Sequence, residues 1–430
     1  MREGRLSVEP ANLSYDVVVV GGGSAGVAAA VGAAATGART LLLERYGFLG
    51  GAATTSNVLA YCGLYAQGGS RPEPVVAGVA TQVIEALTRL GIEAGPISSP
   101  SGNWILRLEC EPLKLALDHV LHRSGADVLL HAPVVAASMD GACIKSVTVA
   151  DLGKSFCVSA RSFVDASGDA VLSAAAGAPM QGGYDSERPR QPGSLPIRIG
   201  GISDTGPDRS ALRQAIAKLQ YTSNENGAAI RRDGGIVLRL PMSNEMWWMV
   251  VDVETGDGSA LAKTLAEMLG RELAWRCVEA LRSDVPGCEK AYLLSAGPQI
   301  GIRDSRQALP RAKITSRMIT EGEDPPDSIG RGGWPMEVHS GLGKCTYQPV
   351  GGAGYFGIPY SAIRADGLRN LWLGGRVIGC EAEAYGSIRV MGTAFATGHA
   401  AGVAAACQAD NQNHSPSIVR ARLSEQGAIL

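Results

Sequence analysis

The stretch DVVVVGGGSAGVAAA, residues 16–30, decides the fold. The β-branched run over residues 15–20 suits a central parallel strand that is covered on both faces. Gly21, Gly23 and Gly26 complete a G-x-G-x-x-G spacing, and an alanine-rich helix follows. The first glycine permits a tight turn, the second lets a phosphate approach the backbone, and the third lets the helix pack on the strand. The stretch therefore predicts the strand, turn and helix that open a Rossmann-like α/β domain.

A second expected strand, ARTLLLE, ends on Glu44. An acid about 20 residues after the glycines accepts hydrogen bonds from a dinucleotide ribose, while the helix N-terminus attracts the phosphates. A glycine-rich structural turn is the alternative. Because strand, helix, second strand and acid all occur in order, the sequence favours a dinucleotide site. The motif does not distinguish a nicotinamide cofactor from a flavin.

The composition is that of a globular protein long enough for two packed domains, with 430 residues, 45% hydrophobic and 19% charged. A formal net charge of -2 gives no field that attracts nucleic acid, so we expect a small-molecule partner. Residues 17–38 are uncharged, but glycine and alanine dominate them, so no membrane association is expected. We expect a monomer or a homodimer.

Cysteine and histidine spacing excludes several other classes of site. The nine cysteines are scattered without a C-x-x-C pair, which indicates reduced thiols rather than a disulfide framework or a zinc ribbon. Residues 1–16 lack the apolar segment of a signal peptide. Both observations favour a cytoplasmic protein. His119, His122 and His131 are not spaced with acids as metal ligands, so no metal is expected.

The residues after the second strand favour a flavin. The segment ERYGFLGGAATT, residues 44–55, adds a second glycine pair and two threonines directly beyond the acid. It resembles the E-R-x-x-x-x-G-G-x-x-T segment of the FAD-dependent oxidoreductase family, within the wider succinate dehydrogenase and fumarate reductase flavoprotein class. In such proteins small residues let the longer FAD pass the strand ends, whereas a nicotinamide domain has no need of them. A flexible loop is the alternative interpretation.

Two more stretches carry the same resemblance. VDASGDAVLSAAAGA, residues 164–178, is similar to the A-T-G-D signature of flavoproteins with two dinucleotide folds. Residues 367–408 contain N-L-x-x-x-G-R, then S-x-R-V and a G-x-A-A-G helix, similar to the family's C-terminal segment. That helix directs its N-terminus at the pyrimidine edge of the flavin, where negative charge gathers on reduction. This third element decides for FAD.

The resemblance extends over nearly the whole chain. GIRDSRQALPRAKIT and TYQPVGGAGYFGIPYSAI are similar to family stretches that contain G-x-R-x-x-R and Y-G-I-P-Y. Two positions depart from many relatives, which carry a histidine at Ala382 and a proline at Gly392. A mechanism that depends on that histidine is therefore in doubt for this chain.

The resemblance implies FAD as the cofactor and assigns a set of binding residues from the matched segments. They are Gly21, Gly23, Ser24, Ala25, Gly26, Glu44, Arg45, Gly50, Gly51, Thr54, Thr55, Val134, Ala166, Asp169, Gly375, Arg376, Gly392 and Thr393.

The expected fold class is α/β: a Rossmann-like, glutathione-reductase-like FAD-binding domain with an inserted α+β substrate or cap domain of antiparallel sheet plus helices. We expect the FAD-binding domain over 12–180, the inserted domain over 181–345 and the returning segment over 346–415. Within the first part, residues 75–123 suggest helices, and three alternating segments after residue 127 suggest a β-meander.

The flavin itself accepts the hydride, so the protein must bind, orient and move a proton. Arginines in the matched segments are candidates for binding an anionic substrate or the reduced flavin; Arg389 is the first choice, followed by Arg376, Arg303 and Arg306. The candidate bases are Glu383, His339, Tyr355 and Tyr385. Each of these residues has a structural alternative, as an ion pair or as packing, and the sequence does not separate the candidates.

The sequence therefore predicts an FAD-dependent oxidoreductase, a dehydrogenase or oxidase that moves hydride from a small organic substrate to the flavin, with the arginines suited to an anionic one. One alternative is a reductase or monooxygenase fed by NAD(P)H, although no second G-x-G-x-x-G lies between a strand and a helix. The other is a non-catalytic flavin-binding protein. Fold alone does not choose among these reactions.

Overall fold

A seven-stranded sheet forms the body of the protein. Its strand order is β6-β2-β1-β9-β8-β7, and β21 pairs with the second half of β9. The pairs among β6, β2, β1, β9 and β21 are parallel, whereas β7, β8 and β9 form an antiparallel meander, as expected from the sequence. The strands span Leu13–Val20 (β1), Thr40–Leu43 (β2), Asp127–Leu129 (β6), Val134–Asp140 (β7), Cys143–Asp151 (β8), Lys154–Asp165 (β9) and Leu371–Leu373 (β21).

These coordinates are a computed structural model. It describes residues 13–93, 95–99, 101–182, 190–203, 206–219, 227–410 and 414–430. Most of the N-terminal segment in which no signal peptide was expected lies outside this range.

The register of the parallel strands brings four chain segments to one edge of the sheet. Val20 pairs with both Leu43 and Asp165, and Asp165 pairs with Leu373, so β1, β2, β9 and β21 end side by side. In open α/β sheets ligands bind outside these carboxyl ends, where neighbouring connections leave in opposite directions. The G-x-G-x-x-G turn, Glu44 and the segment after Asp165 all begin at this edge.

Two small-residue helices pack closely above the sheet. Helix α1 (Ser24–Ala35) lies against α10 (Met391–Ala409), and both helices are buried along most of their length. A Cβ on Gly398 would lie 2.1 Å from the Ala25 carbonyl oxygen, and one on Gly402 would lie 2.0 Å from that of Ala29. Glycine at these positions therefore lets the two backbones touch, which carries the N-terminus of α10 to the same edge of the sheet as the N-terminus of α1.

The prediction of helices over residues 75–123 is right at both ends and wrong in the middle. Helices α3 (Val79–Arg89) and α4 (Cys110–Ser124) form as expected. Between them β4 (Pro96–Ser98) and β5 (Trp104–Arg107) pair with β3 (Ala60–Cys62) in a small antiparallel sheet. A strand of three or four residues shows too little alternation to be recognised in the sequence. The pairing of β5 with β3, more than forty residues earlier, is also not visible there.

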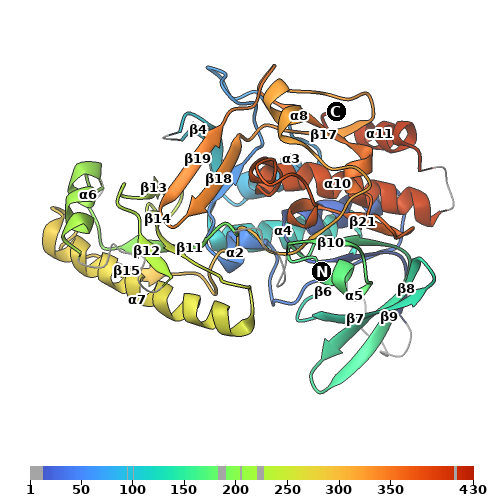
Figure 1. Ribbon diagram of the computed structural model, residues 1–430, viewed down its shortest axis with the longest axis horizontal. Coiled ribbons are helices and arrows are strands. Elements are labelled where there is room, and N and C mark those ends of the chain that lie inside the picture. Colours follow the sequence, from blue (N-terminus) through green and yellow to red (C-terminus); the bar gives the residue numbers. More distant parts are fainter. Residues whose placement is uncertain are drawn as a thin grey trace.

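A second, antiparallel sheet carries the inserted part of the chain. Its order is β12-β14-β11-β15, with β13 beside β14; helix α7 packs on it and α6 packs against α7 (Figure 1). The expected architecture of antiparallel sheet plus helices is confirmed. The elements span Gly193–Gly200 (β11), Arg209–Lys218 (α6), Ala228–Ile230 (β12), Ile236–Arg239 (β13), Met246–Val253 (β14), Ala260–Asp284 (α7) and Tyr292–Ser295 (β15).

Buried apolar side chains form two clusters, one in each part. The smaller cluster contains residues from Leu195 to Ile300, whereas Ala308, Ile314 and Met336 belong to the larger one. Residues beyond about position 300 therefore pack with the main body rather than with the second sheet. The domain boundaries proposed from the sequence remain predictions.

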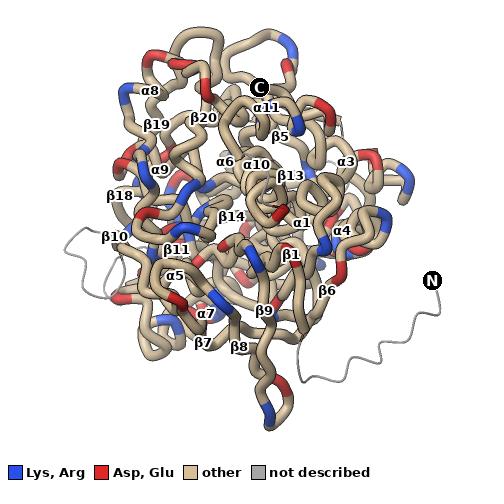
Figure 2. The backbone as a smooth tube through the Cα atoms, turned by 90° about the vertical axis from the view of Figure 1, so that its right-hand side faces the viewer, with Lys and Arg blue, Asp and Glu red and all other residues tan. Residues whose placement is uncertain are grey.

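The rest of the chain forms short elements that border the two sheets. They are α2 (Ala52–Thr55), α5 (Val171–Ala175), β10 (Met180–Gln181), β16 (Gln307–Ala308), α8 (Ser316–Glu321), β17 (Ser328–Gly332), β18 (Met336–Gly341), β19 (Lys344–Gln348), β20 (Phe356–Pro359), η1 (Tyr360–Ile363), η2 (Gly375–Val377), α9 (Tyr385–Ile388) and α11 (Pro416–Glu425). Figure 2 shows basic and acidic residues interspersed along the backbone, in keeping with the net charge near zero. None of the helices in the described part of the chain is long and apolar enough to cross a membrane.

Candidate active site

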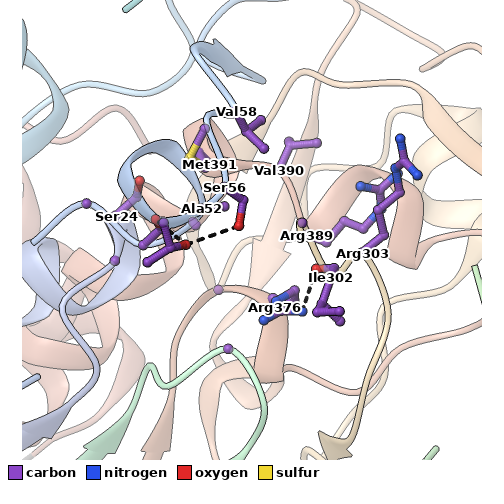
Figure 3. Close-up of a pocket in the computed structure, with 18 of the residues that line it drawn as sticks. Ser24, Ala52, Ser56, Val58, Ile302, Arg303, Arg376, Arg389, Val390 and Met391 are labelled. Atoms are coloured by element: carbon purple, nitrogen blue, oxygen red, sulfur yellow. Dashed lines mark hydrogen bonds between the residues drawn. The ribbon is translucent and has the colours of Figure 1, made fainter. Parts of the chain in front are cut away.

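A cavity of about 620 Å³ lies at the carboxyl edge of the main sheet. One wall consists of the turn after β1, the end of β2, the segment after β9 and the N-terminus of α10. The opposite wall comes from the second sheet, through Leu238, Trp247 and Met249. Figure 3 shows Ser24 and Ala52 at one end of this space and Arg303 and Arg389 at the other. The cavity is thus shared between the Rossmann-like body and the inserted sheet.

The glycine-lined end of the cavity is shaped for a phosphate group. Gly23 is the N-cap of α1, and no side chain caps this helix, so its first N–H groups face the cavity. A Cβ on Gly23 would meet one neighbouring atom within 4 Å, the Cα of Gly51 at 3.6 Å. The two glycine loops therefore lie against each other, with the Gly50 N–H donating to the Gly22 carbonyl oxygen at 2.9 Å. Among the described residues no side chain caps the N-terminus of α1 beside this contact, which fits a close approach of the FAD pyrophosphate to the backbone.

Glu44 is held in place by backbone donors. Gly22 N–H donates to its Oε2 at 2.6 Å, and Tyr46 N–H donates to its Oε1 at 2.9 Å. The carboxylate lines the cavity although its residue is only 6% exposed. Each oxygen keeps a lone pair beyond these bonds, so the group can accept hydrogen bonds from the two hydroxyls of a ribose.

Replacing Glu44 by alanine is expected to weaken FAD binding without abolishing it. The change removes ribose hydrogen bonds and adds no side chain at the glycines proposed to face the pyrophosphate. Lost bonds to a charged acceptor correspond to about 2 kcal/mol, or roughly a 30-fold rise in Kd. Titration of the FAD-free protein with FAD, followed by the change in flavin absorbance, measures this. A variant that binds as tightly as the parent would place the ribose elsewhere.

Asp169 is an ionised carboxylate between two arginines. Its oxygens lie 3.0 Å from Arg376 Nη2 and 3.8 Å from Arg45 Nη2. Burial acts to raise the pKa of Asp169, but Arg376, Arg45 and a hydrogen bond from Ser305 together hold it below its usual value. Arg376 also donates to the Ile302 carbonyl oxygen at 2.6 Å (Figure 3). These contacts tie the β9 and β21 segments to the chain that returns from the second sheet.

Most of the expected cofactor residues share this cavity, and four do not. Thr54 Oγ1 donates to the Leu49 carbonyl oxygen, Thr393 Oγ1 donates to that of Ser387, and Gly26 and Gly392 pack against backbone. Those that line the cavity are Gly21, Gly23, Ser24, Ala25, Glu44, Arg45, Gly50, Gly51, Thr55, Val134, Ala166, Asp169, Gly375 and Arg376. A Cβ on Gly392 would lie 2.3 Å from the Cys62 carbonyl oxygen, so this glycine seats α10 on β3.

Of the candidates for chemistry, Arg389 lines the cavity and the proposed bases do not. Glu383 is exposed, and Tyr355 lies under the guanidinium of Arg331. Tyr385 is buried, with its hydroxyl donating to the Arg376 carbonyl oxygen at 3.0 Å. His339 is 2% exposed and does not line the cavity, but it contacts Glu337, which does.

Besides Arg389 and Arg376, the candidate arginines were Arg303 and Arg306, and both make contacts within the protein. Arg303 lines the cavity and pairs with Asp252 at 3.4 Å. Arg306 Nε donates to the Asp169 carbonyl oxygen at 3.2 Å.

Glu337 is the cavity carboxylate that the sequence interpretation missed. It lies on β18, two residues before His339, and Tyr347 of the paired strand β19 lines the same wall. Residues two apart in a strand point to the same face, so E-x-H in a short strand was the available signal. Its significance depends on Arg389, which approaches from a distant part of the chain.

Glu337 and His339 form a hydrogen bond between an ionised carboxylate and a neutral imidazole. His339 Nε2 lies 3.0 Å from Glu337 Oε1. Burial and the charge of Arg303 lower the pKa of His339 to about 4, although Glu337 acts to raise it. Burial acts to raise the pKa of Glu337, but His339 and Arg389 together hold it well below its usual range. At neutral pH the imidazole is therefore neutral, with its Nε2–H donating to an ionised carboxylate.

Cys345 completes a group of three potential metal ligands with this pair. One ligand atom from each of Glu337, His339 and Cys345 lies within 4.8 Å of the others. The charges of Arg303 and Arg389 oppose a cation there, since both act on His339. The other ring nitrogen, Nδ1, has no acceptor among the described residues, whereas metal-binding histidines usually have one. The absence of a metal remains a prediction.

The buried His339 is expected to make stability fall as the pH drops from 6.5 to 4. In this window the unfolded chain protonates the histidine and the folded protein does not, so protons favour unfolding. A pKa of about 4 against 6.5 corresponds to about 3 kcal/mol lost by the lower limit. The melting temperature, measured by thermal unfolding at several pH values across this range, should fall more steeply with falling pH for the parent than for His339→Gln. Parallel curves for the two proteins would contradict the assignment.

Comparison with known proteins is consistent with this cavity. The profile of the FAD dependent oxidoreductase family matches residues 16–426. The chain belongs to this family. It is an FAD-dependent oxidoreductase with a Rossmann-like α/β fold, and FAD is its cofactor. The family match does not test membership of the succinate dehydrogenase and fumarate reductase class, which remains a prediction. The search of curated proteins found no significant match.

Several solved structures resemble this chain at low sequence identity. BexE, studied for oxidation during BE-7585A biosynthesis, is 13% identical, with a TM-score of 0.50 over 96% of this chain and 66% of its own. A geranylgeranyl bacteriochlorophyll reductase-like protein from Thermoplasma acidophilum is 14% identical, with a TM-score of 0.49 over 97% of this chain and 85% of its own. The OxyS anhydrotetracycline hydroxylase from Streptomyces rimosus is 12% identical, with a TM-score of 0.49 over 96% of this chain and 66% of its own. At such identities the likeness concerns the fold alone.

Proposed function

We infer that this FAD-dependent oxidoreductase is a dehydrogenase or oxidase that removes hydride from a small organic anion. When bound, FAD supplies the acceptor for the hydride pair. Gly23, Gly51 and the N-terminus of α1 would hold its pyrophosphate, and Glu44 its ribose. The remaining end of the cavity, between α10 and the second sheet, is left for the flavin ring and the substrate.

The observation that carries this proposal is the state of Arg389. Its Nη2 donates to the Glu337 carbonyl oxygen at 3.2 Å, its Nε has no acceptor, and no carboxylate lies within 4.0 Å among the described residues. By contrast, Arg303 and Arg376 in the same cavity are paired with Asp252 and Asp169. A guanidinium with unused donors, facing a cavity, is suited to an anionic ligand group.

Arg389 also stands beside the helix that is expected to face the flavin. Val390 is the N-cap of α10, and no side chain caps this helix. Its first N–H groups and the guanidinium together place positive charge at one end of the cavity. Such preorganised charge stabilises an anion as it forms, so it would assist both substrate binding and flavin reduction.

Anaerobic reduction of the purified protein tests the proposal. We expect the yellow FAD absorbance to bleach when an organic anion of the right class is added without NAD(P)H. Bleaching by NADPH alone, with organic anions inactive, would instead support the reductase or monooxygenase alternative. The cytoplasmic location, the absence of nucleic-acid partners and the monomeric or homodimeric state belong to the same proposal. They are supported by the charge balance and the scattered cysteines alone.

A further inference from the structure

Glu337 lines the cavity, and the two oxygens of its carboxylate differ in hydrogen bonding. Oε1 accepts from His339 Nε2 at 3.0 Å and from the Tyr347 hydroxyl at 3.3 Å. Oε2 accepts from Trp334 Nε1 at 2.9 Å. A carboxylate oxygen has two lone pairs, so Oε1 is satisfied while Oε2 keeps one acceptor position among the described residues. The side chain is 13% exposed, and its residue lines the cavity.

A buried negative charge with an unused acceptor position calls for a donor. Its partners hold Glu337 ionised, because three neutral N–H or O–H groups donate to it and Arg389 lies nearby. A substrate with anionic groups alone would meet repulsion at this carboxylate. A substrate that also carries a hydroxyl or an ammonium group would donate to Oε2 and remove that cost.

Arg389 and Glu337 are fixed to the same piece of backbone. The Arg389 guanidinium donates to the main-chain oxygen of Glu337, while the Glu337 carboxylate lies beyond ion-pair distance from it. Gly386 on α9 supports this arrangement, since a Cβ there would lie 2.6 Å from both the N and O atoms of Glu337. The cavity therefore presents a cation with unused donors and an anion with an unused acceptor position side by side, without an ion pair between them.

The cavity that contains this pair has an apolar wall from the second sheet, although Arg303 and Arg231 also line it. Trp247, Met249, Leu238 and Ile236 of the second sheet line the cavity together with Trp334. Trp247 is fixed by its Nε1–H, which donates to the Asn57 carbonyl oxygen at 2.5 Å. Rigid aromatic and aliphatic side chains favour an apolar body on the ligand.

We propose that the substrate is a carboxylate with a hydroxyl or ammonium group on the adjacent carbon and an apolar side chain. Its carboxylate binds Arg389, its hydroxyl or ammonium group donates to Glu337 Oε2, and its side chain packs against Trp247 and Trp334. The inference rests on the proposed function, since it assumes that the Arg389 end of the cavity takes the substrate. It adds that a 2-hydroxy or 2-amino acid is preferred over a simple acid.

Ligand binding to the anaerobic holoenzyme, whose flavin has first been reduced with dithionite, tests this without turnover, because reduced FAD cannot accept a hydride. The probes are 3-phenyllactate, phenylalanine and 3-phenylpropanoate, which share the carboxylate and the phenyl group and differ in the 2-substituent. Quenching of tryptophan fluorescence and isothermal calorimetry report the Kd. We expect at least one substituted acid to bind roughly 10- to 100-fold more tightly than 3-phenylpropanoate, as for a hydrogen bond to a charged group. The tighter of the two identifies the donor as hydroxyl or ammonium.

Matched variants separate the two contacts. Glu337→Gln should remove the preference for the substituted acid and leave 3-phenylpropanoate binding unchanged or tighter. Arg389→Gln should weaken all three acids together, because they share the carboxylate. Glu85→Gln on α3, which is exposed and forms an ion pair with Arg89, is the control and should change nothing.

The outcomes for the two proposals are distinguishable. Equal binding of the three acids, no binding of any, or a preference that survives Glu337→Gln would overturn the substrate class. Tight binding that depends on Glu337, without anaerobic bleaching of the FAD, would leave the binding site standing and overturn the dehydrogenase function. Bleaching of the FAD by anions that lack a 2-substituent, with Glu337→Gln bleached as readily as the parent, would leave the dehydrogenase function standing and overturn the substrate class.

Discussion

Gly23→Ala is expected to yield a folded protein without FAD, whereas Gly26→Ala is expected not to fold. At Gly23 the backbone is extended, and a Cβ would meet the Cα of Gly51 at 3.6 Å, an ordinary contact. The methyl group would instead stand where the pyrophosphate is expected to approach the backbone. A loss of at least about 100-fold in FAD affinity, near 2.7 kcal/mol, follows from blocking this approach.

Gly26 has the opposite environment. A Cβ there would lie 1.7 Å from the carbonyl oxygen of Gly21, so alanine forces α1 away from the β1 turn. Such a backbone clash places the change among the most destabilising single substitutions, beyond about 4 kcal/mol. Circular dichroism and thermal unfolding, measured beside the absorbance ratio at the flavin and protein bands, separate the two results. Full FAD content in folded Gly23→Ala would refute the pyrophosphate assignment.

The contrast between these glycines also shows what sequence alone could provide. The G-x-G-x-x-G spacing predicted the strand, the turn and the helix, because each step is a local requirement of a few consecutive residues. The motif also predicted that a phosphate approaches Gly23 and that Gly26 packs the helix on the strand, and in the structure Gly23 lines the cavity while Gly26 meets backbone. No comparable local signal in the sequence marked the role of Gly392, which was expected at the cofactor and packs α10 against the backbone of β3.

The sequence identified a candidate site residue where the signal lay in one segment, and missed one whose surroundings come from several segments. Arg389 was found because it precedes a recognisable helix. Glu337 was missed because its neighbours, Trp334, Tyr347 and Arg389, come together only when the β18–β19 hairpin packs beside α9. His339 attracted attention as a titratable residue, yet its role in the structure is to donate to Glu337. Side-chain type identified the region, and packing assigned the roles within it.

Arg389→Ala is expected to keep the fold and most of the FAD but to slow reduction of the flavin by substrate. The side chain has one backbone acceptor and no carboxylate partner among the described residues, so its removal leaves no buried acid uncompensated by direct contact. What is lost is positive charge where the substrate anion binds. Removal of one preorganised electrostatic contact corresponds to on the order of 100-fold in rate, or about 2.7 kcal/mol.

Arg376→Ala provides the comparison, because this arginine has structural partners. Its donors go to the Ile302 carbonyl oxygen and to Asp169, and Asp169 would keep only the hydrogen bond from Ser305 and the more distant Arg45. We therefore expect Arg376→Ala to lose about 1–3 kcal/mol of stability and part of its FAD, as for a partly buried hydrogen-bonded charge. Its remaining FAD should be reduced at nearly the parent rate.

Stopped-flow reduction at saturating substrate decides between a role for Arg389 in catalysis and one in packing. A slow limiting rate in Arg389→Ala, partly restored in Arg389→Lys, would follow from lost positive charge, since lysine returns a cation without the planar fork. A raised KM with an unchanged limiting rate would mean that the guanidinium binds the substrate equally well before and during hydride transfer. If Arg389→Ala is reduced as fast as the parent at every substrate concentration, the active site does not lie at this end of the cavity.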